Sequence, residues 1–271
     1  MKKILAVLLV AVLAIGCFAL TACGGDATFG GNYEEATAED ILVFATEAEN
    51  AGGSSDIDLA DGCEVKMIVK NMPQPMAPYG YGVADMEMTL RIVSENGAMK
   101  AEGTAKGKTK LTSGMYSGME SDTTGKVYWT DGYMYVTEDV TQRFQGQTAT
   151  GNVKNKMPVT LDAYLDGQMS ELDGFDFEEL VPMALTLGEK MGLSIARDEN
   201  STKIKFVIPE NNSVGGEIIF VFDANYNLTS MRYDVTIGSG EDAFEMDITY
   251  KPYSGSVSLP NDLDTYPLYG A

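Results

Sequence analysis

Apolar and polar residues alternate along much of this chain with a period of two. The clearest run is Ala84–Ile92, in which five apolar residues alternate with Asp, Glu, Thr and Arg. Alternation of this kind is typical of a β-strand with one buried face. Similar runs at Val65–Val69, Met231–Ile237 and Phe244–Tyr250 predict further strands of the same type. The chain should therefore form a sheet that buries one of its faces.

The predicted strands are separated by short gaps rich in Gly, Asn and Asp. Asn96-Gly97 and Asp131-Gly132 are dipeptides that two-residue hairpin turns prefer. Gaps of this length connect neighbours that run in opposite directions, so we expect an antiparallel sheet. The remaining strands are expected at Lys126–Thr130, Tyr133–Thr137, Lys203–Ile208, Glu217–Asp223, Leu228–Ile237 and Ala243–Tyr250.

Three segments lack a clear strand pattern. Residues 72–82 contain three prolines and should not enter a central ladder, because proline lacks the N–H donor. Residues 145–159 are polar and are interpreted as irregular. Residues 98–120 are rich in Lys, Thr, Ser and Gly and are predicted to hold one or two exposed strands.

Two stretches have helical periodicity instead. Thr37-Ala38-Glu39-Asp40 has the pattern of a capping box. Apolar residues follow it at helical spacing: Ile41, Leu42, Ala45 and Ala48. Gly52-Gly53 ends this predicted helix of about 14 residues. Residues 160–172 and 176–190 predict a short and a longer helix, the second ending before Gly192.

The N-terminus has the layout of a secretory signal peptide. Lys2 and Lys3 supply a positive start, and Ile4–Leu20 is uncharged and mostly apolar. Leu20-Thr21-Ala22-Cys23 follows and resembles the lipobox of bacterial lipoproteins, with Leu three positions before the Cys and small residues between them. That resemblance implies that a diacylglyceryl group is attached to the Cys23 sulfur and that a peptidase then cleaves before this residue.

The lipobox resemblance divides the chain into three parts. Residues 1–22 are expected to be a removed signal peptide, residues 23–33 a lipidated flexible tether, and residues 34–271 a single antiparallel β-rich domain. Two acyl chains, such as palmitate, anchor a protein stably, so we expect it on the extracytoplasmic face of the cell membrane. Two alternatives stay open: lipidation at Cys17, although Ala14 stands where Leu is expected, and a plain secretory signal or uncleaved anchor.

The net charge of the chain limits the classes of partner that it is expected to bind. The chain has 19 basic and 40 acidic residues. Loss of residues 1–22 takes away two lysines and no acid, which leaves a net charge of −23. Such a charge repels nucleic acid and anionic lipid head groups. The acyl chains would therefore hold the protein on the membrane, and no nucleic-acid partner is expected.

The side chains offer little catalytic chemistry. The sequence has no histidine, which excludes Ser-His-Asp and Cys-His catalysis and imidazole-based zinc sites. It also lacks the P-loop, G-x-G-x-x-G and G-x-S-x-G motifs. Asp56–Gly62 and Asp223–Asn227 carry several oxygen ligands, but their spacing favours plain turns over calcium loops. We expect no enzyme activity, cofactor or metal site; a hydrolase with two carboxylates is the least favoured hypothesis.

Methionine is the residue type that points to a ligand. Its side chain is flexible and polarisable, and proteins use it on surfaces that adapt to apolar partners. The filling of an irregular core is an equally weighted alternative. The candidate residues for lining an apolar-ligand site lie on the apolar faces of predicted strands: Met67, Met86, Met88, Met134, Met231 and Met246.

The order of elements resembles a known group of lipoproteins. A lipobox, a tether, one helix and a long antiparallel run with a helical interruption are similar to the LolA/LolB-like and LppX-like lipoprotein carriers. The closing segments add to the likeness, especially to uncharacterised lipoproteins of Gram-positive anaerobes: Ile219–Asp223, Leu228–Ile237, Phe244–Tyr253 and Val257–Pro260.

This resemblance implies an α+β fold, namely a strongly curved antiparallel sheet (an incomplete β-barrel) with an N-terminal helix and a helical lid. In that family the enclosed space holds acyl chains. The leading hypothesis is a membrane-anchored, non-catalytic protein that binds a lipid or another apolar ligand in a cavity between sheet and helices. The alternative is a surface interaction or sensor module with a solid core, which binds a protein or cell-wall polymer through residues 72–82.

Overall fold

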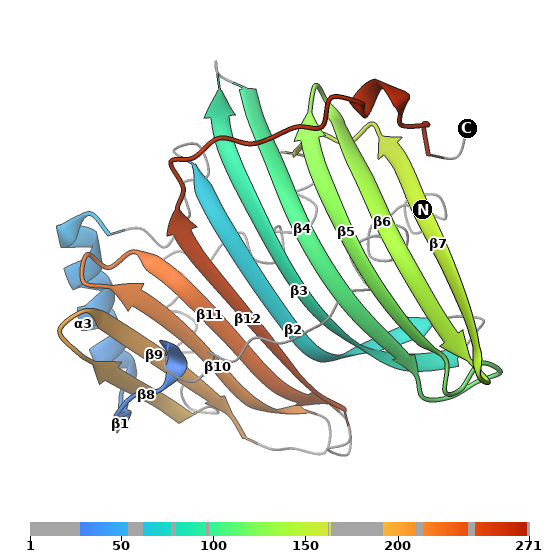
Figure 1. Cartoon of the computed structure of the whole chain (residues 1–271). Helices are drawn as coiled ribbons and strands as arrows, with labels where there is room; N and C mark the ends of the chain where they lie inside the picture. Colours follow the sequence, from blue (N-terminus) through green and yellow to red (C-terminus); the bar gives the residue numbers. More distant parts are fainter. Residues whose placement is uncertain are drawn as a thin grey trace. The chain divides into compact units, whose positions relative to one another are not determined.

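The computed structural model describes residues 28–53, 62–76, 80–95, 98–161, 163, 192–209, 214–237 and 242–269. The chain divides into two compact units, whose elements are labelled in Figure 1. The meander unit is built on Leu59–Tyr164 and Pro252–Ala271, and the helix unit on Ala22–Asp58 and Leu165–Lys251. The helices in the described part of the chain are too short or too polar to span a membrane.

In the meander unit each strand runs antiparallel to the one before it. The strands are β2 (Cys63–Met76), β3 (Gly80–Glu95), β4 (Ala98–Leu111), β5 (Glu120–Thr130), β6 (Tyr133–Phe144) and β7 (Gln147–Met157). The backbone angle φ is 53° at Asp131 and 79° at Gly132, as a type I′ hairpin turn requires. The antiparallel sheet and this turn are thus confirmed, whereas Asn96-Gly97 lies outside the described residues.

Side-chain alternation gives this sheet two faces of different character. The apolar face carries the odd-numbered residues of β4, β5, β7 and of β2 up to Val69, and the even-numbered residues of β3 and β6. The charged residues of these strands lie on the opposite, polar face, with the exception of Glu138. One row on the apolar face is buried across the strands: Cys63, Ile92, Ala101, Trp129, Met134 and Met157.

Two segments that the sequence pattern marked as irregular are strands, which corrects the prediction. Met72–Met76 continues β2 and pairs with Gly80–Ala84 of β3. Pro73 and Pro75 are two residues apart, so they remove donors from only one side of the strand and leave the other side able to pair. The second segment forms β7, which is mostly exposed and pairs with β6, so it needs no apolar stripe.

The exposed strands predicted within residues 98–120 are also corrected. β4 is one strand, and its alternate residues from Ala101 to Leu111 are buried. Four of those six residues are Ala or Gly and one is Thr. Because these side chains are small, the buried face of β4 gives almost no hydrophobic signal in the sequence.

Among its described residues, the helix unit combines an α-helix with a run of antiparallel strands. Its strand order is β1 (Glu34–Glu35), β8 (Gly192–Arg197), β9 (Ser201–Ile208), β10 (Val214–Asp223), β11 (Leu228–Ile237) and β12 (Asp242–Pro252). The four predicted C-terminal strands are confirmed, whereas β1 and β8 were not predicted. Asp223–Asn227 is a plain turn, in which Asp223 Oδ1 accepts hydrogen bonds from the backbone N–H groups of Asn225 and Asn227.

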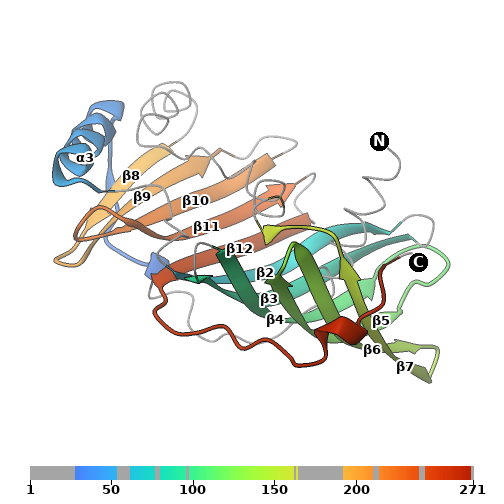
Figure 2. The same cartoon turned by 90° about the horizontal axis from the view of Figure 1, so that it is seen from above.

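Helix α3 (Ala38–Ala51) packs on one face of these strands (Figure 2). The ring centroid of Phe44 lies 5.0 Å from that of Phe222 and 5.5 Å from that of Tyr226. The buried stripe of the helix consists of Ile41, Phe44, Ala45 and Ala48. Leu42, which the sequence pattern placed in that stripe, is 49% exposed, because it lies about 100° around the helix from Ile41, outside the centre of the stripe.

Thr37 caps α3 with the predicted capping box. The Asp40 N–H donates to Thr37 Oγ1 at 3.3 Å, and the Thr37 N–H donates to Asp40 Oδ2 at 2.7 Å. We expect Thr37→Ala to lower the free energy of unfolding by about 1 kcal/mol in urea denaturation. Thr46→Ala, at an exposed position inside the same helix, is the control and should have almost no effect, since alanine favours helix. Equal losses in the two variants would contradict a capping role.

Several predictions fall on residues outside the described ranges. The lipobox with Cys23 and most of the helical lid are among them. Of residues 160–172, the structure describes only 160, 161 and 163, and there Ala163 N–H donates to Thr160 Oγ1 at 3.1 Å. Within the predicted tether, Phe29 is buried against Ile219 and Val221 of the helix unit. The predicted single domain of residues 34–271 stays a prediction.

The C-terminal segment of the meander unit, Tyr253–Tyr269, runs over the polar face and contains a short 3-10 helix, η1 (Leu263–Thr265). At its start Tyr253 N–H donates to the Gly62 carbonyl at 3.0 Å. At its end the Lys156 backbone bonds to Pro267 and Tyr269. Between them, Tyr266 packs on Tyr135, and its hydroxyl lies 2.7 Å from Thr137 Oγ1. These contacts attach the segment at both ends.

Candidate functional site

Three of the six candidate methionines come together on the apolar face of the meander unit. Met67 on β2 lies directly opposite Met88 on β3, and Met86 is two residues from Met88 on the same face. All three are half-buried. We call these three residues the methionine cluster.

The other candidate residues lie elsewhere. Met134 is on the same face but is buried between Trp129 and Met157, so it belongs to the core row. Met231 and Met246 are in the helix unit, on one face of β11 and β12. Met231 is buried and Met246 is half-buried. Cys23, the lipidation candidate, lies outside the described residues.

Small residues adjoin the methionine cluster on the apolar face. Ala105 lies opposite Met88, Gly107 lies opposite Met86, and Gly125 on β5 lies opposite Ala105. We call Ala105, Gly107 and Gly125 the small-residue patch. None of these positions carries a large side chain; Ala105 and Gly107 are buried and Gly125 is half-buried.

The small-residue patch ends at a buried carboxyl group. Glu138 on β6 lies opposite Gly125 and is 8% exposed. Its Oε1 has no hydrogen-bond partner among the described residues. Burial raises the pKa of Glu138 to about 7, because the charged form is poorly solvated there.

Two further polar atoms accompany Glu138. On the same face, Thr123 on β5 lies opposite Val140 and Asn155 on β7 lies opposite Val136, so the two occupy diagonal positions on opposite sides of Glu138. Thr123 Oγ1 and Asn155 Oδ1 are buried and have no hydrogen-bond partner in the described part of the chain. Sequence reasoning missed Glu138, although the alternation Met134, Val136, Glu138, Val140 already places it in phase with apolar residues.

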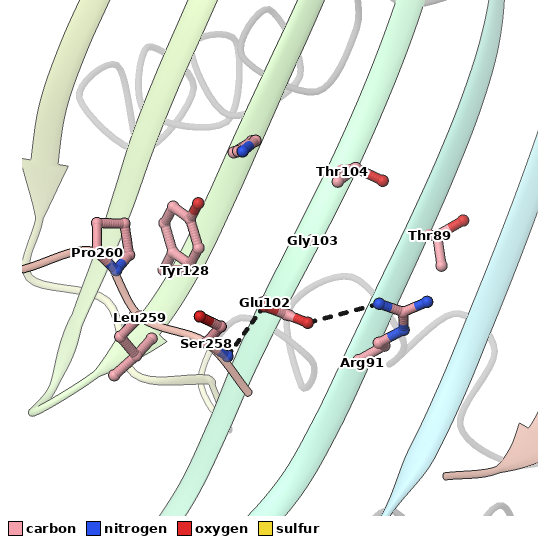
Figure 3. A pocket seen from close by; sticks show the side chains of 10 residues that line it. Thr89, Arg91, Glu102, Gly103, Thr104, Tyr128, Ser258, Leu259 and Pro260 are labelled. Carbon is pink, nitrogen blue, oxygen red and sulfur yellow. Dashed lines mark hydrogen bonds and ion pairs between the residues drawn. The ribbon is translucent and has the colours of Figure 1, made fainter. Parts of the chain in front are cut away.

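A separate cavity of about 510 Å³ lies on the polar face, between the strands and the C-terminal segment (Figure 3). It is lined by β3, β4 and β5 and by Ser258, Leu259 and Pro260. Figure 3 shows Tyr128 beside Leu259 and Pro260, and Glu102 between Ser258 and Arg91.

Charged groups of this cavity hold the C-terminal segment in place. Glu102 Oε2 accepts a hydrogen bond of 3.0 Å from Ser258 N–H, and Glu102 Oε1 lies 3.6 Å from Arg91 Nη1. Arg91 Nε also donates to Glu64 Oε2 at 2.7 Å, and its guanidinium lies 5.3 Å from the centre of the Tyr253 ring. We therefore attribute these contacts to attachment of the segment.

No protein-family model and no curated protein sequence matches this chain. Among solved structures, the chain is similar to a beta-barrel-like protein of the domain of unknown function DUF1849 from Brucella abortus. The two share 11% sequence identity with a TM-score of 0.24, and the match covers 73% of this chain and 100% of that one. At this TM-score the similarity assigns neither a fold family nor a function.

Proposed function

We propose that this is a lipid-anchored protein of the extracytoplasmic membrane face that binds an apolar ligand without catalysis. The observation that carries the proposal is the methionine cluster beside the small-residue patch on the apolar face of the meander unit. Flexible thioether side chains next to small residues form a surface that adapts to an apolar chain. A lipid or another amphiphile is the ligand class that such a surface favours.

Burial of a hydrocarbon chain of about ten methylenes would be enough to support binding. Each methylene removed from water contributes about 0.8 kcal/mol, so ten methylenes give roughly 8 kcal/mol, which corresponds to a micromolar dissociation constant. Ordering of the bound chain and of the methionine side chains offsets part of this gain. We expect dissociation constants on the order of 1–100 μM for single-chain ligands.

The membrane anchor is the second part of the proposal and comes from the lipobox resemblance. A diacylglyceryl group on Cys23 would place the two units outside the membrane, at the end of a short tether. The net charge of the mature chain disfavours attraction to anionic head groups, so anchoring would depend on the acyl chains.

The interaction-module alternative has weaker support. Residues 72–82, which it would use, include strand segments of β2 and β3. The cavity on the polar face is the other place where a polymer could bind, but Arg91 and Glu102 there contact the C-terminal segment.

Binding of a neutral apolar dye, N-phenyl-1-naphthylamine, tests the proposal. The protein lacking residues 1–23 is suitable, because the contacts described above lie between residues 28 and 269. We expect wild type to bind the dye and the double variant Met67→Gln, Met88→Gln to bind it at least about ten-fold more weakly, since two polar amides would replace apolar contacts. Fluorescence titration measures both.

Met115→Gln is the matched control, because Met115 lies in the exposed turn between β4 and β5 and is 83% exposed. It should bind the dye as wild type does. Native mass spectrometry of the detergent-free protein should also show a bound lipid. If there is neither a bound lipid nor a dye response, or if the control loses as much affinity as the double variant, the proposed site is wrong.

A further inference from the structure

We infer that the free edge of strand β7 pairs antiparallel with the same edge of a second copy of this chain. The pairing residues are Thr148–Lys154, and the two-fold axis passes beside Gly151. This inference uses the meander unit alone and does not depend on the proposed ligand. It follows from the direction of the backbone hydrogen bonds of β7, from the limits of its free edge and from the residues that would meet.

The pairing of β7 with β6 fixes which backbone groups point outward. β7 is the terminal strand of the meander unit and has β6 on one side (Figure 1). The angle φ is 50° at Gln145 and 78° at Gly146, as in a type I′ turn, so Gln147 N–H bonds back to Phe144. The register continues from there without a shift, and bonded and non-bonded residues alternate. The even-numbered residues of β7 therefore direct their N–H and C=O groups away from β6.

The C-terminal segment bonds to β7 in this same phase. Lys156 N–H donates to the Pro267 carbonyl at 2.8 Å, and the Lys156 carbonyl accepts from Tyr269 N–H at 2.9 Å. Leu268 lies beside Lys156 in a parallel β-bridge. The outer edge of β7 thus pairs with an extended segment, and the protein's own C-terminal segment occupies one end of it.

The rest of this edge is open among the described residues. Four outward-facing residues have no backbone hydrogen-bond partner there: Thr148, Thr150, Asn152 and Lys154. Gln147–Val153 is exposed throughout. Edge strands are usually protected by charged side chains, proline or bulges, and this run has none of them. Such an edge favours pairing with another strand.

The limits of the free edge select its partner and the register. The β6–β7 turn bounds the edge before Thr148, and the C-terminal segment bounds it after Lys154. Gly151 lies midway, so an antiparallel pairing centred on it uses all four outward residues of both copies. It forms about eight inter-chain hydrogen bonds, two at each outward pair. A strand from another protein would need a free edge of the same length, whereas a second copy always brings one.

The side chains that would meet are compatible. In this register the opposing residues of the two copies are Thr148 with Lys154, Thr150 with Asn152, and Ala149 with Val153. The two Lys154 side chains lie six positions apart, roughly 20 Å, which exceeds the Debye length of about 8 Å at physiological salt. A Cβ atom at Gly151 would meet no atom within 4 Å, so the described fold does not require glycine there. Glycine suits a strand position that another backbone approaches closely.

Sedimentation velocity of the protein lacking residues 1–23 tests the inference. One strand pair is a small interface, so we expect a dimer with a dissociation constant on the order of 10–100 μM. The variant Thr150→Glu, Asn152→Glu places like charges opposite each other and should weaken the dimer at least about ten-fold. Thr104→Glu, Thr124→Glu is the matched control, because it adds the same charges at exposed positions of inner strands. The control should dimerise within about two-fold of wild type.

A charge exchange tests the register itself. Thr150→Lys, Asn152→Lys should also fail to self-associate, whereas its mixture with the Thr150→Glu, Asn152→Glu variant should form a dimer at least as tight as that of wild type, because opposite charges then meet. Thermal melts check that each variant is folded.

Three outcomes would overturn the inference. A wild-type protein that stays monomeric at about 300 μM would leave the edge of β7 to a strand of another protein. A dimer that survives the two glutamates would use a different surface. Failure of the two charged variants to associate with each other would exclude the register centred on Gly151.

Discussion

A Cys23→Ala variant of the full chain should incorporate no radiolabelled palmitate and should keep residues 1–22. In the lipobox family the diacylglyceryl group is attached to the cysteine sulfur, and cleavage follows that attachment. Without the thiol, neither step has a substrate. The effect is all or none, because a protein without any acyl chain has no lipid anchor. Metabolic labelling and the intact mass of the purified protein measure both changes.

The other two cysteines supply the controls for this experiment. Cys17→Ala tests the competing lipobox position, and Cys63→Ala removes a buried free thiol of β2. Both variants should carry the label and begin at residue 23. Label that persists in Cys23→Ala, or that disappears in Cys17→Ala, would show that lipidation occurs at another cysteine.

Local signals in the sequence predicted the elements that depend on local contacts. The capping box at Thr37, the ending at Gly52 and the length of α3 all match the structure, because caps and helical periodicity involve residues within four positions of one another. The Asp131-Gly132 turn matches for the same reason. Strands β10–β12 match because their buried residues are large and strongly apolar.

Elements whose burial depends on non-local partners were missed. β4 buries Ala101 and Gly103 against residues of β3 and β5. These residues are small because of the neighbouring strands, and they give no hydrophobic pattern in the sequence. A Cβ atom at Gly103 would lie only 2.6 Å from Val127 Cγ1. Such a requirement is visible only once the strands are paired. β7 was missed because strand pairing, rather than burial of an apolar stripe, holds it.

The candidate site likewise has features that local sequence signals predicted and features that depend on the pairing of strands. Alternation alone placed Met67, Met86 and Met88 on apolar strand faces. It did not show that Met67 faces Met88, because cross-strand register depends on turn and bulge positions. The bulge in β2 contains Asn71, with φ at 54° and its N–H bonded to Asp85. Alternation also did not show that Met231 and Met246 belong to the helix unit. The alternation of apolar residues along β6 could have identified Glu138 as a residue of the apolar face. That Gly125 lies opposite it is known only once the strands are paired.

A second large effect concerns the stability of the helix unit. Arg232 on β11 and Asp247 on β12 form a bidentate ion pair, with Nε–Oδ1 at 2.7 Å and Nη2–Oδ2 at 2.8 Å. Both residues are buried. The guanidinium carbon also lies 4.4 Å from the centre of the Phe29 ring, which covers this side of the pair. Breaking such a pair leaves a charge in a poorly solvated place, and that costs more than the pair itself contributes.

We therefore expect Arg232→Met to lower the free energy of unfolding by about 3–5 kcal/mol, because Asp247 would stay buried without its partner. Arg143→Met is the control: Arg143 pairs with Asp122 at an exposed position of the meander unit, and its loss should cost less than about 1 kcal/mol. Urea denaturation gives both values. The double variant Arg232→Met, Asp247→Leu should be more stable than Arg232→Met, since the unpaired charge is gone. If the double variant is no more stable, lost packing rather than an unpaired charge explains the loss.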